Sequence, residues 1–296
     1  MKLTTANQVF ARNPDERNAL SQKHIAFAGC GSIGGGVADM AARTGVGRVT
    51  LFDPDVVSPE NIGRHVLTTR DIGKPKVDAL ASHLLAINPE LAITRVCGPF
   101  SGDLAETPDL LISAVDSFQC ESLINIYSLG TKVPAIYSGV WGAASVGELY
   151  YVIPGKTPCY HCFASFRQDA ASELPTDPRK YTDPDFDDTR VPGRPGLWAQ
   201  ILVVSGLCFQ LGLGLLGLRP QLIDELHTLW LFNMTDFNSS LQPLAVTFGK
   251  TAQRGCAVCD PARLGDLEAG VRGCGVGDEH NSDTREVEQC QSDSCS

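Results

Sequence analysis

The sequence predicts an α/β protein with a doubly wound, Rossmann-like, mostly parallel sheet that is extended by antiparallel strands and carries a structural zinc knuckle. Three observations predict this fold class. Short apolar segments alternate with helical patterns through the first half of the chain, as in parallel sheets with crossover helices. A glycine-rich turn, Gly29-Cys-Gly31-Ser-Ile-Gly34, follows the first apolar segment. Two Cys-x-x-Cys pairs lie in the second half.

Five apolar segments in the first half are expected to be strands of the parallel sheet. They span residues 24–28, 49–52, 91–96, 109–115 and 133–140. The segment 109–115 is nearly all apolar, as a strand covered on both faces should be. Helical periodicity between them predicts helices after the glycine turn, over 74–88 and over 117–130. Because ligands bind beyond the carboxyl ends of the strands in such sheets, residues that directly follow a strand are candidate site residues.

The second half of the chain departs from this alternation near residue 143. We expect strands over 145–152, 226–232 and 244–248, an apolar helix over about 196–218, and a long loop over 164–195 that is rich in proline and aspartate. The predicted organisation is an N-terminal arm (1–23), a main domain (24–260) with two halves (24–142 and 143–260), and an acidic tail (261–296). The tail is poor in apolar residues and is expected to be disordered.

Composition argues against several classes of protein. The net charge of −10 disfavours nucleic acid as a partner. Eleven cysteines, an odd number, do not suit a secreted disulfide framework, and the polar residues after Met1 predict no secretion signal, so we expect a cytoplasmic protein. The stretch 201–218 has no charge, but its polar and glycine residues favour a buried helix over a membrane span.

The glycine turn and the acid that follows it are typical of a nucleotide site. Gly29, Gly31 and Gly34 form the Gly-x-Gly-x-x-Gly pattern after the first strand, where glycines let the backbone turn sharply and approach a phosphate at a helix N-terminus. Asp53 ends the second strand and can accept hydrogen bonds from a ribose. These features alone predict only that a nucleotide binds, and a nicotinamide or flavin cofactor remains an alternative.

Polar residues after Asp53 narrow the chemistry. Asn61 and Arg64 would share one face of a helical turn, and Lys76 follows them. An arginine and a lysine beside a nucleotide predict charge compensation on a polyphosphate, although a solvated charged loop is the alternative. Asp116 ends a buried strand, where a carboxylate either holds Mg²⁺ or caps the next helix. The nearby cations favour magnesium.

The two Cys-x-x-Cys pairs predict a metal site. Each pair can present two thiolates to one tetrahedral ion, and a site with four thiolates leaves no position open for catalysis. A redox-active Cys-x-x-Cys is the alternative, which the presence of two such pairs disfavours. We therefore expect structural zinc on Cys159, Cys162, Cys256 and Cys259.

Together these residues resemble the ThiF/MoeB-type adenylating enzymes, the bacterial relatives of ubiquitin-activating enzymes. The resemblance covers about residues 10–260 and implies an adenylation domain over 24–260, with a nucleotide-binding first half and a second half that binds zinc and a partner. It implies MgATP-dependent adenylation of the C-terminal glycine of a ubiquitin-like or sulfur-carrier protein with a Gly-Gly tail, releasing pyrophosphate. The motifs that carry the resemblance are Gly29-x-Gly31-x-x-Gly34, Asp53-x-Asp55, Asn61-x-x-Arg64, Lys76, Asp116 and the cysteine pairs.

The resemblance also implies roles for individual residues. The implied enzyme is a homodimer, in which Arg12 of the N-terminal arm would reach the partner subunit's site as a catalytic residue, with Arg17 as second candidate. The catalytic residues in the same chain would be Arg64, Lys76 and Asp116, the last as a magnesium ligand. The nucleotide would contact Gly29, Gly31, Gly34, Asp53, Asp55, Asn61, Arg64 and Lys76, with Asp53 on the ribose and the last three residues on the phosphates.

Two departures from the family pattern limit what the resemblance implies. Glu60-Asn61-Ile62 replaces the usual Ser-Asn-Leu, and residues 163–207 contain none of the cysteines with which many relatives form a covalent intermediate. Cys208 is expected to be buried and inert, whereas Cys120 is expected near the crevice. The activated tail could therefore pass directly to a downstream acceptor protein. The alternative functions are an NAD- or FAD-dependent oxidoreductase and an adenylating enzyme for a peptide or small-molecule carboxylate.

Overall fold

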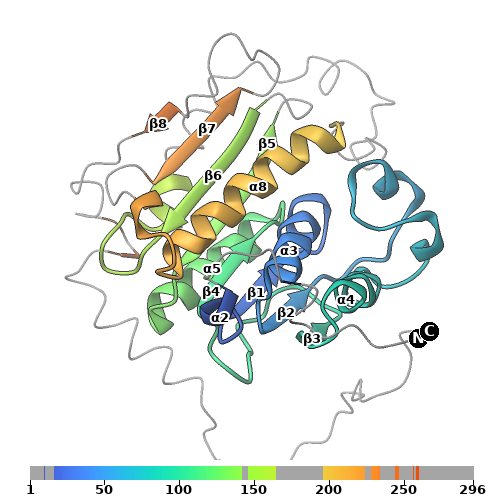
Figure 1. Ribbon diagram of the computed structural model, residues 1–296. Helices are drawn as coiled ribbons and strands as arrows, with labels where there is room; N and C mark the ends of the chain where they lie inside the picture. Colours follow the sequence, from blue (N-terminus) through green and yellow to red (C-terminus); the bar gives the residue numbers. More distant parts are fainter. Residues whose placement is uncertain are drawn as a thin grey trace, which may run out of the picture.

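Strands and helices alternate through the computed structural model of the chain (Figure 1). The structure describes residue 10 and residues 17–141, 146–164, 196–223, 228–233, 244–246, 256 and 258–259. The strands are β1 (His24–Ala28), β2 (Arg48–Phe52), β3 (Ala92–Val96), β4 (Leu110–Ser113), β5 (Ala135–Trp141), β6 (Val146–Val152), β7 (Leu229–Asn233) and β8 (Leu244–Val246). The helices are α2 (Arg17–Leu20), α3 (Ser32–Thr44), α4 (Lys76–Ile87), α5 (Phe118–Thr131) and α8 (Trp198–Leu215), with 3-10 helices η1 (Pro59–Arg64), η2 (Thr69–Asp71) and η3 (Pro220–Leu222).

These strands form one sheet of eight in the order β3-β2-β1-β4-β5-β6-β7-β8. The pairs from β3 to β5 are parallel, and β6, β7 and β8 continue the sheet antiparallel. The predicted fold class is therefore confirmed as a mixed α/β sheet of the Rossmann-like kind. The chain leaves β1 first toward β2 and β3 and later returns to β4 and β5, so the switch point of the topology lies between β1 and β4.

Helices cover both faces of the sheet, as a doubly wound fold requires. Alternate residues of β1 enter two separate cores: Ile25 and Phe27 pack on the face with α3, α4 and α8, whereas Ala26 and Ala28 pack on the face with α5. Figure 1 shows α8 and α3 lying together on one side of the sheet. Every residue of β1 is buried. Its sequence is therefore a nearly continuous apolar run, without the alternation of polar and apolar residues that is typical of strands with one exposed face.

Helix α8 is the apolar helix expected from the sequence. It is long and apolar enough to cross a membrane, but half of it is buried inside the structure. Glycines allow its close approach to the neighbouring elements: a Cβ on Gly36 of α3 would lie 2.7 Å from the Ser205 hydroxyl, and one on Gly212 would lie 3.2 Å from Leu110. Its packing against α3 and the sheet explains both the apolar composition and the glycines, and confirms the interpretation as a buried helix.

Local signals set the ends of the other helices. Helix α4 begins after Pro75 and ends at Asn88, whose N–H donates to the Leu84 carbonyl, in agreement with the predicted stop. Helix α5 begins after Ser117, whose hydroxyl accepts from the Cys120 N–H. Residues 165–195 of the predicted loop (164–195), most of the N-terminal arm and the acidic tail lie outside the described residues.

Candidate functional site

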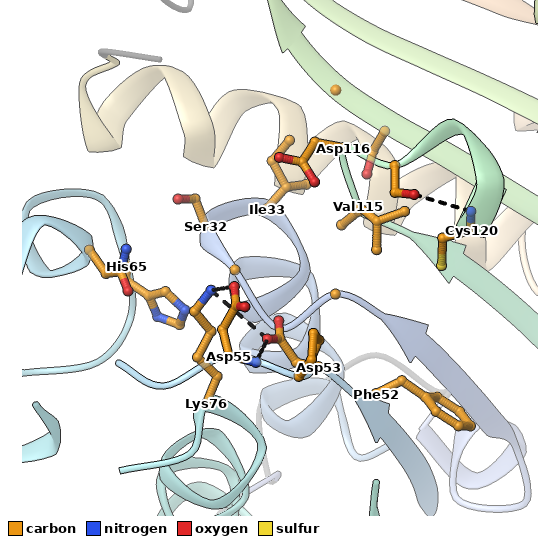
Figure 2. A pocket seen from close by; sticks show the side chains of 18 of the residues that line it. Ser32, Ile33, Phe52, Asp53, Asp55, His65, Lys76, Val115, Asp116 and Cys120 are labelled. Atoms are coloured by element: carbon orange, nitrogen blue, oxygen red, sulfur yellow. Dashed lines mark hydrogen bonds and ion pairs between the residues drawn. The ribbon is translucent and has the colours of Figure 1, made fainter. Parts of the chain in front are cut away.

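A pocket of about 680 Å³ opens where β1, β2 and β4 end, beside the second half of β5 and at the switch point of the sheet. Figure 2 shows Asp53, Asp55 and Lys76 grouped on one side of it, with Asp116, Val115 and Cys120 on the other. The pocket therefore collects residues from separate strands, as the fold class predicts. The predicted site residues that line it are Gly29, Gly31, Asp53, Asp55, Asn61, Arg64, Lys76 and Asp116.

The three glycines of the turn have different structural roles. Gly29 has a φ of 93°, and a Cβ there would lie 2.6 Å from the Ala114 carbonyl oxygen. A Cβ on Gly34 would lie 2.0 Å from the Gly29 carbonyl oxygen, whereas one on Gly31 would meet nothing within 4 Å. Only Gly29 and Gly31 line the pocket. Gly34 therefore allows close packing of the helix on its own loop, and the nucleotide contacts of Gly31 and Gly34 stay predictions.

The N-terminus of α3 borders the pocket and offers backbone N–H groups that can bind an anion. Gly31 is its N-cap residue and makes no side-chain cap hydrogen bond, so this residue leaves the first N–H groups of the helix without a cap. Ser32 and Ile33, which carry two of these groups, line the pocket. Uncapped N–H groups and the positive end of the helix dipole together favour a phosphate at this position.

Asp53 is buried directly after β2, lines the pocket and binds two backbone N–H groups beside it. Its Oδ2 accepts from the Cys30 N–H at 2.7 Å, and its Oδ1 accepts from the Asp55 N–H at 2.9 Å. Burial raises the pKa of Asp53, and the Lys76 charge and the two backbone donors act against that rise. Each carboxylate oxygen has a second lone pair, so both can still accept from the hydroxyls of a ribose.

Lys76 reaches the pocket because the segment after β2 pairs with the start of α4. The Lys76 N–H donates to the Asp55 carbonyl, and the Val57 N–H donates to the Lys74 carbonyl. The Lys76 Nζ then lies 2.6 Å from Asp55 Oδ2 and 3.9 Å from Asp53 Oδ1 (Figure 2). Asp55 is largely exposed, so it can give up this ion pair when phosphate oxygens offer Lys76 a stronger partner.

Asn61 and Arg64 both lie in η1 and both line the pocket. The Asn61 side-chain oxygen accepts from the Ser58 N–H at 3.0 Å, so it forms the capping box that starts this 3-10 helix. Because the side-chain oxygen is engaged in this bond, Asn61 could make the predicted contact with a phosphate only through its side-chain nitrogen. Arg64 stands at the other end of the short helix and is half-buried, where its charge can act on the pocket.

Asp116 is an exposed carboxylate on the pocket wall. The sequence left open whether it caps α5, and the structure decides this point. Ser117 occupies the N-cap position of α5 and its hydroxyl accepts from Cys120 N–H. Asp116 is therefore not the cap of this helix, and its oxygens can bind a cation in the pocket.

Several lining residues carry no signal in the sequence. His65 directly follows Arg64, is buried, and its Nε2 lies 2.7 Å from the Cys30 carbonyl oxygen. Phe100 packs edge-on against Phe52 on the wall of the pocket. Cys120 lines the pocket as expected, but burial raises the pKa of its thiol, which disfavours the reactive thiolate. Only the folded chain brings His65 and Phe100 to the pocket, so no local spacing could have identified these two residues, whereas Cys120 was expected from its place after Asp116.

The four predicted cysteines converge on the opposite face from α3. Their sulfur atoms all lie within 4.8 Å of one another. The Cys159–Cys162, Cys159–Cys256 and Cys162–Cys259 sulfur pairs are 3.9, 4.0 and 3.5 Å apart. A tetrahedral ion with metal–sulfur bonds of about 2.3 Å needs sulfur atoms about 3.8 Å apart. The cluster therefore fits a zinc-sized ion.

Aromatic and polar residues hold this cysteine cluster against α5. Tyr160 stacks on Tyr137 with ring centroids 4.5 Å apart, and its hydroxyl donates to the buried Glu121 of α5. The side-chain oxygen of Asn125 in α5 accepts from the Tyr160 N–H at 3.0 Å. Such contacts orient metal ligands from outside the coordination sphere.

Comparisons with known proteins identify the family of the chain. The model of the ThiF family matches residues 5–252. The chain belongs to the ThiF family. The sulfur carrier protein ThiS adenylyltransferase of Bacillus subtilis is 30% identical over 156 residues, which cover 50% of this chain and 46% of that protein. The ubiquitin-like modifier-activating enzyme 5 of Drosophila simulans is 33% identical over 159 residues, which cover 48% of this chain and 39% of that protein.

A solved structure shares the fold of this ThiF-family chain. The crystal structure of Escherichia coli MccB with ATP superimposes with a TM-score of 0.62 at 20% identity, covering 82% of this chain and 68% of that one. The chain spans 39% to 46% of the length of the curated relatives that it matches. The structural likeness supports the fold, and the identity of any substrate must come from the residues of the pocket.

Three other residues singled out in the sequence of this ThiF-family chain, Arg12, Arg17 and Cys208, lie away from the pocket or outside the described residues. Arg12 lies outside the described residues. The second candidate, Arg17, lies over the Phe10 ring and against Gly45, at the far end of α3 from the pocket of its own chain. Cys208 is fully buried in α8, as expected, and burial raises its pKa to about 12, which disfavours the reactive thiolate.

Proposed function

We propose that the chain uses ATP to adenylate a C-terminal carboxylate, and that this carboxylate is the Gly-Gly tail of a ubiquitin-like or sulfur-carrier protein. The observation that carries the proposal is the composition of the pocket at the switch point. It combines an uncapped helix N-terminus, a buried ribose-type acid and two cations with a carboxylate facing them. Membership of the ThiF family and the names of the two curated relatives point in the same direction.

The residues have the chemistry that this reaction needs. An oxygen of the tail carboxylate would attack the α-phosphorus, the bond from that phosphorus to the bridging oxygen would break, and pyrophosphate would leave with the electron pair. Both reactants are anionic, so positioning and charge compensation supply most of the rate enhancement. Lys76 and Arg64 would bind phosphate oxygens and Asp53 the ribose. Asp116 would hold Mg²⁺, which when bound neutralises charge on the phosphates.

The cysteine cluster is proposed to hold structural zinc. Four sulfur ligands would fill the coordination of a tetrahedral ion and leave no position for a reactant. The sulfur atoms of the Cys159–Cys162, Cys159–Cys256 and Cys162–Cys259 pairs are 3.5 to 4.0 Å apart, much farther than the roughly 2 Å of a disulfide bond. The adenylation unit is proposed to extend over residues 24–260, in agreement with the family match over 5–252. A cytoplasmic location and a homodimer are further proposals that rest on the sequence and the family resemblance.

The test of the proposed function is ATP–pyrophosphate exchange with the full chain. Purified ubiquitin-like and sulfur-carrier proteins ending in Gly-Gly would be compared with the same proteins lacking the last glycine, and with short peptides. Exchange that needs the intact tail supports the proposal. Exchange with peptides alone supports the peptide-adenylating alternative, and saturable NAD binding without ATP binding supports an oxidoreductase.

Matched variants test the site assignment in the same assay. Lys76→Ala and Asp116→Ala are each expected to lower exchange at least about 100-fold, because each removes charge compensation at the phosphates. The controls are Lys74→Ala, whose ammonium pairs with Asp71 outside the pocket, and Asp103→Ala on an exposed turn. Exchange that survives in the two pocket variants would refute these assignments.

A further inference from the structure

Side chains hold both backbone polar groups of one residue in the glycine turn, and so fix two consecutive peptide units. The Cys30 N–H donates to Asp53 Oδ2 at 2.7 Å, and the Cys30 carbonyl accepts from the His65 ring at 2.7 Å. Cys30 itself is fully buried, so water does not compete for either bond. Asp53 was expected to act on a ribose, whereas nothing in the proposed reaction uses His65.

The hydrogen-bond partners of His65 define the protonation of its ring. A carbonyl oxygen can only accept, so Nε2 must carry a proton toward Cys30. The Leu67 backbone N–H can only donate, and it lies 3.2 Å from Nδ1, so Nδ1 must present a lone pair. The ring is therefore neutral in one tautomer. Burial lowers the pKa of His65 to about 4, which agrees with that assignment.

The ring is also fixed in place by packing. Only 7% of His65 is exposed, and a Cβ added to Gly35 in the first turn of α3 would lie 2.9 Å from the His65 Cε1. His65 is the C-cap residue of η1, directly after Arg64. The imidazole thus connects the end of η1 to the glycine turn and to the start of α3, which are the elements that surround the phosphate end of the pocket.

Holding the Cys30 carbonyl sets the direction of the next N–H group. In a planar trans peptide the C=O and the following N–H point in opposite directions, so the bond from His65 to Cys30 determines where the Gly31 N–H points. Gly31 lines the pocket. In the described part of the chain its N–H donates to no acceptor. An N–H in this position is a donor available to a ligand oxygen.

We propose that His65 is a positioning residue for the nucleotide: by donating to the Cys30 carbonyl, it aims the Gly31 N–H at a phosphate oxygen and keeps the Arg64 turn in register with the glycine turn. This inference rests on the proposed nucleotide site. The competing explanation is that His65 is a buried histidine that only contributes stability. The two explanations differ in what happens when one ring nitrogen is replaced at a time.

Two substitutions separate the two ring nitrogens. In His65→Gln the side-chain amide nitrogen can take the place of Nε2, so the bond to the Cys30 carbonyl is retained. In His65→Asn the shorter side chain reaches only the position of Nδ1, so the bond to Leu67 can be retained while that to Cys30 is lost. The control is His24→Asn at the other end of β1. His24 is buried to a similar extent and bonds through Nε2 to the Thr50 hydroxyl.

The measurement is the Kd of ATP for the full chain by calorimetry, together with the melting temperature of each variant. We expect His65→Asn to weaken ATP binding about tenfold, the size of effect that follows from losing one well-aligned hydrogen bond to a charged ligand. His65→Gln should stay within about threefold of the wild type. His24→Asn should lower the melting temperature but leave the Kd unchanged.

Other outcomes would overturn the proposal. Equal losses of ATP affinity in His65→Gln and His65→Asn would show that only the shape of the ring matters. An affinity within twofold of the wild type in His65→Asn would remove the role altogether, and a matching loss in His24→Asn would assign the effect to general destabilisation. Because the Kd of ATP needs no second substrate, failure of the proposed adenylation would leave this test intact.

A second variant reaches the same ring without changing its polar atoms. Gly35→Ala would place a Cβ against the His65 Cε1 and displace the ring from Cys30. We expect it to weaken ATP binding in the same way as His65→Asn. In the double variant Gly35→Ala, His65→Asn the two losses should not add, because the bond to Cys30 can be lost only once. Additive losses would contradict a shared mechanism.

Discussion

The pocket and the cysteine cluster are both built from predicted residues, but they differ in whether their polar groups already have partners within the protein. In the cysteine cluster each thiol faces another thiol, and the Tyr160 hydroxyl and Asn125 satisfy the surroundings. The pocket keeps an exposed Asp116, an uncapped helix N-terminus and a Gly31 with open space beside it. The first arrangement stabilises the fold and the second leaves binding capacity for a ligand.

This difference predicts that the two regions can be damaged separately. Changes in the cysteine cluster should lower stability first, and changes on the open side of the pocket should lower ligand binding first. The following predictions test that separation, beginning with the largest expected change in the free energy of unfolding.

Cys159→Ser should remove most of the bound zinc and lower the free energy of unfolding by about 5 kcal/mol or more, because metal binding at a four-thiolate site is coupled to folding. Metal content by emission spectroscopy and thermal unfolding measure the two effects. The exposed Cys97 provides the control, since Cys97→Ser should leave one zinc per chain and an unchanged melting temperature. Less than half an equivalent of zinc in the wild type would argue against a zinc site.

Gly34→Ala should cost about 3 kcal/mol or more, because its Cβ would meet a backbone oxygen that cannot move aside. Gly31→Ala should change stability by less than about 0.5 kcal/mol, yet weaken ATP binding, because its Cβ would occupy the space left for a phosphate. Denaturant unfolding and the Kd of ATP give the two values. Equal stability of the two variants would remove the distinction between these glycines.

Acid should destabilise the wild type more than His65→Gln. The pKa of His65 is lowered in the fold to about 4, against 6.5 for the free side chain. Between those values the unfolded chain binds more protons, so this contribution to stability is present above about pH 6.5 and is lost as the pH falls toward 4. At pH 4.5 the difference should amount to about 2.5 kcal/mol. Parallel pH profiles of the two proteins would contradict the lowered pKa.

Tyr160→Phe should cost about 2 kcal/mol, because it leaves the buried Glu121 without the Tyr160 hydroxyl. Zinc content and the Kd of ATP should not change, since the ring still stacks on Tyr137. The control Tyr127→Phe alters a half-buried hydroxyl and should cost less than 1 kcal/mol, about the net value of one hydrogen bond. A loss of ATP affinity in Tyr160→Phe would show that α5 couples the cysteine cluster to the pocket.

Much of the fold could be predicted because its signals are local. Each strand in the described part of the chain overlaps a predicted segment, with ends that differ by up to three residues, and Asn88 caps α4 where the stop was predicted. Parallel strands buried on both faces leave continuous apolar runs, and helices leave a distinct period. The position of Asp53 at the end of a strand was likewise local, and so its place in the pocket followed from the fold class.

Other parts of the site could not be predicted, because they depend on contacts between distant residues. The sequence assigned Gly31 and Gly34 the same role, but only the second faces the Gly29 carbonyl. It left Asp116 between a helix cap and a cation ligand, and the neighbouring Ser117 proved to be the cap. His65 had no distinguishing pattern, since its partner Cys30 lies 35 positions away.

The sequence by itself therefore determined the order and type of the elements, the nucleotide-type turn and the two cysteine pairs, because each depends on spacing along the chain. Only the tertiary structure decided which polar groups are already satisfied and which still face the pocket. Satisfaction of a donor or acceptor depends on partners brought together by packing. For the same reason, the Gly31 N–H and the imidazole of His65 acquire their proposed roles only when the glycine turn, η1 and α3 meet.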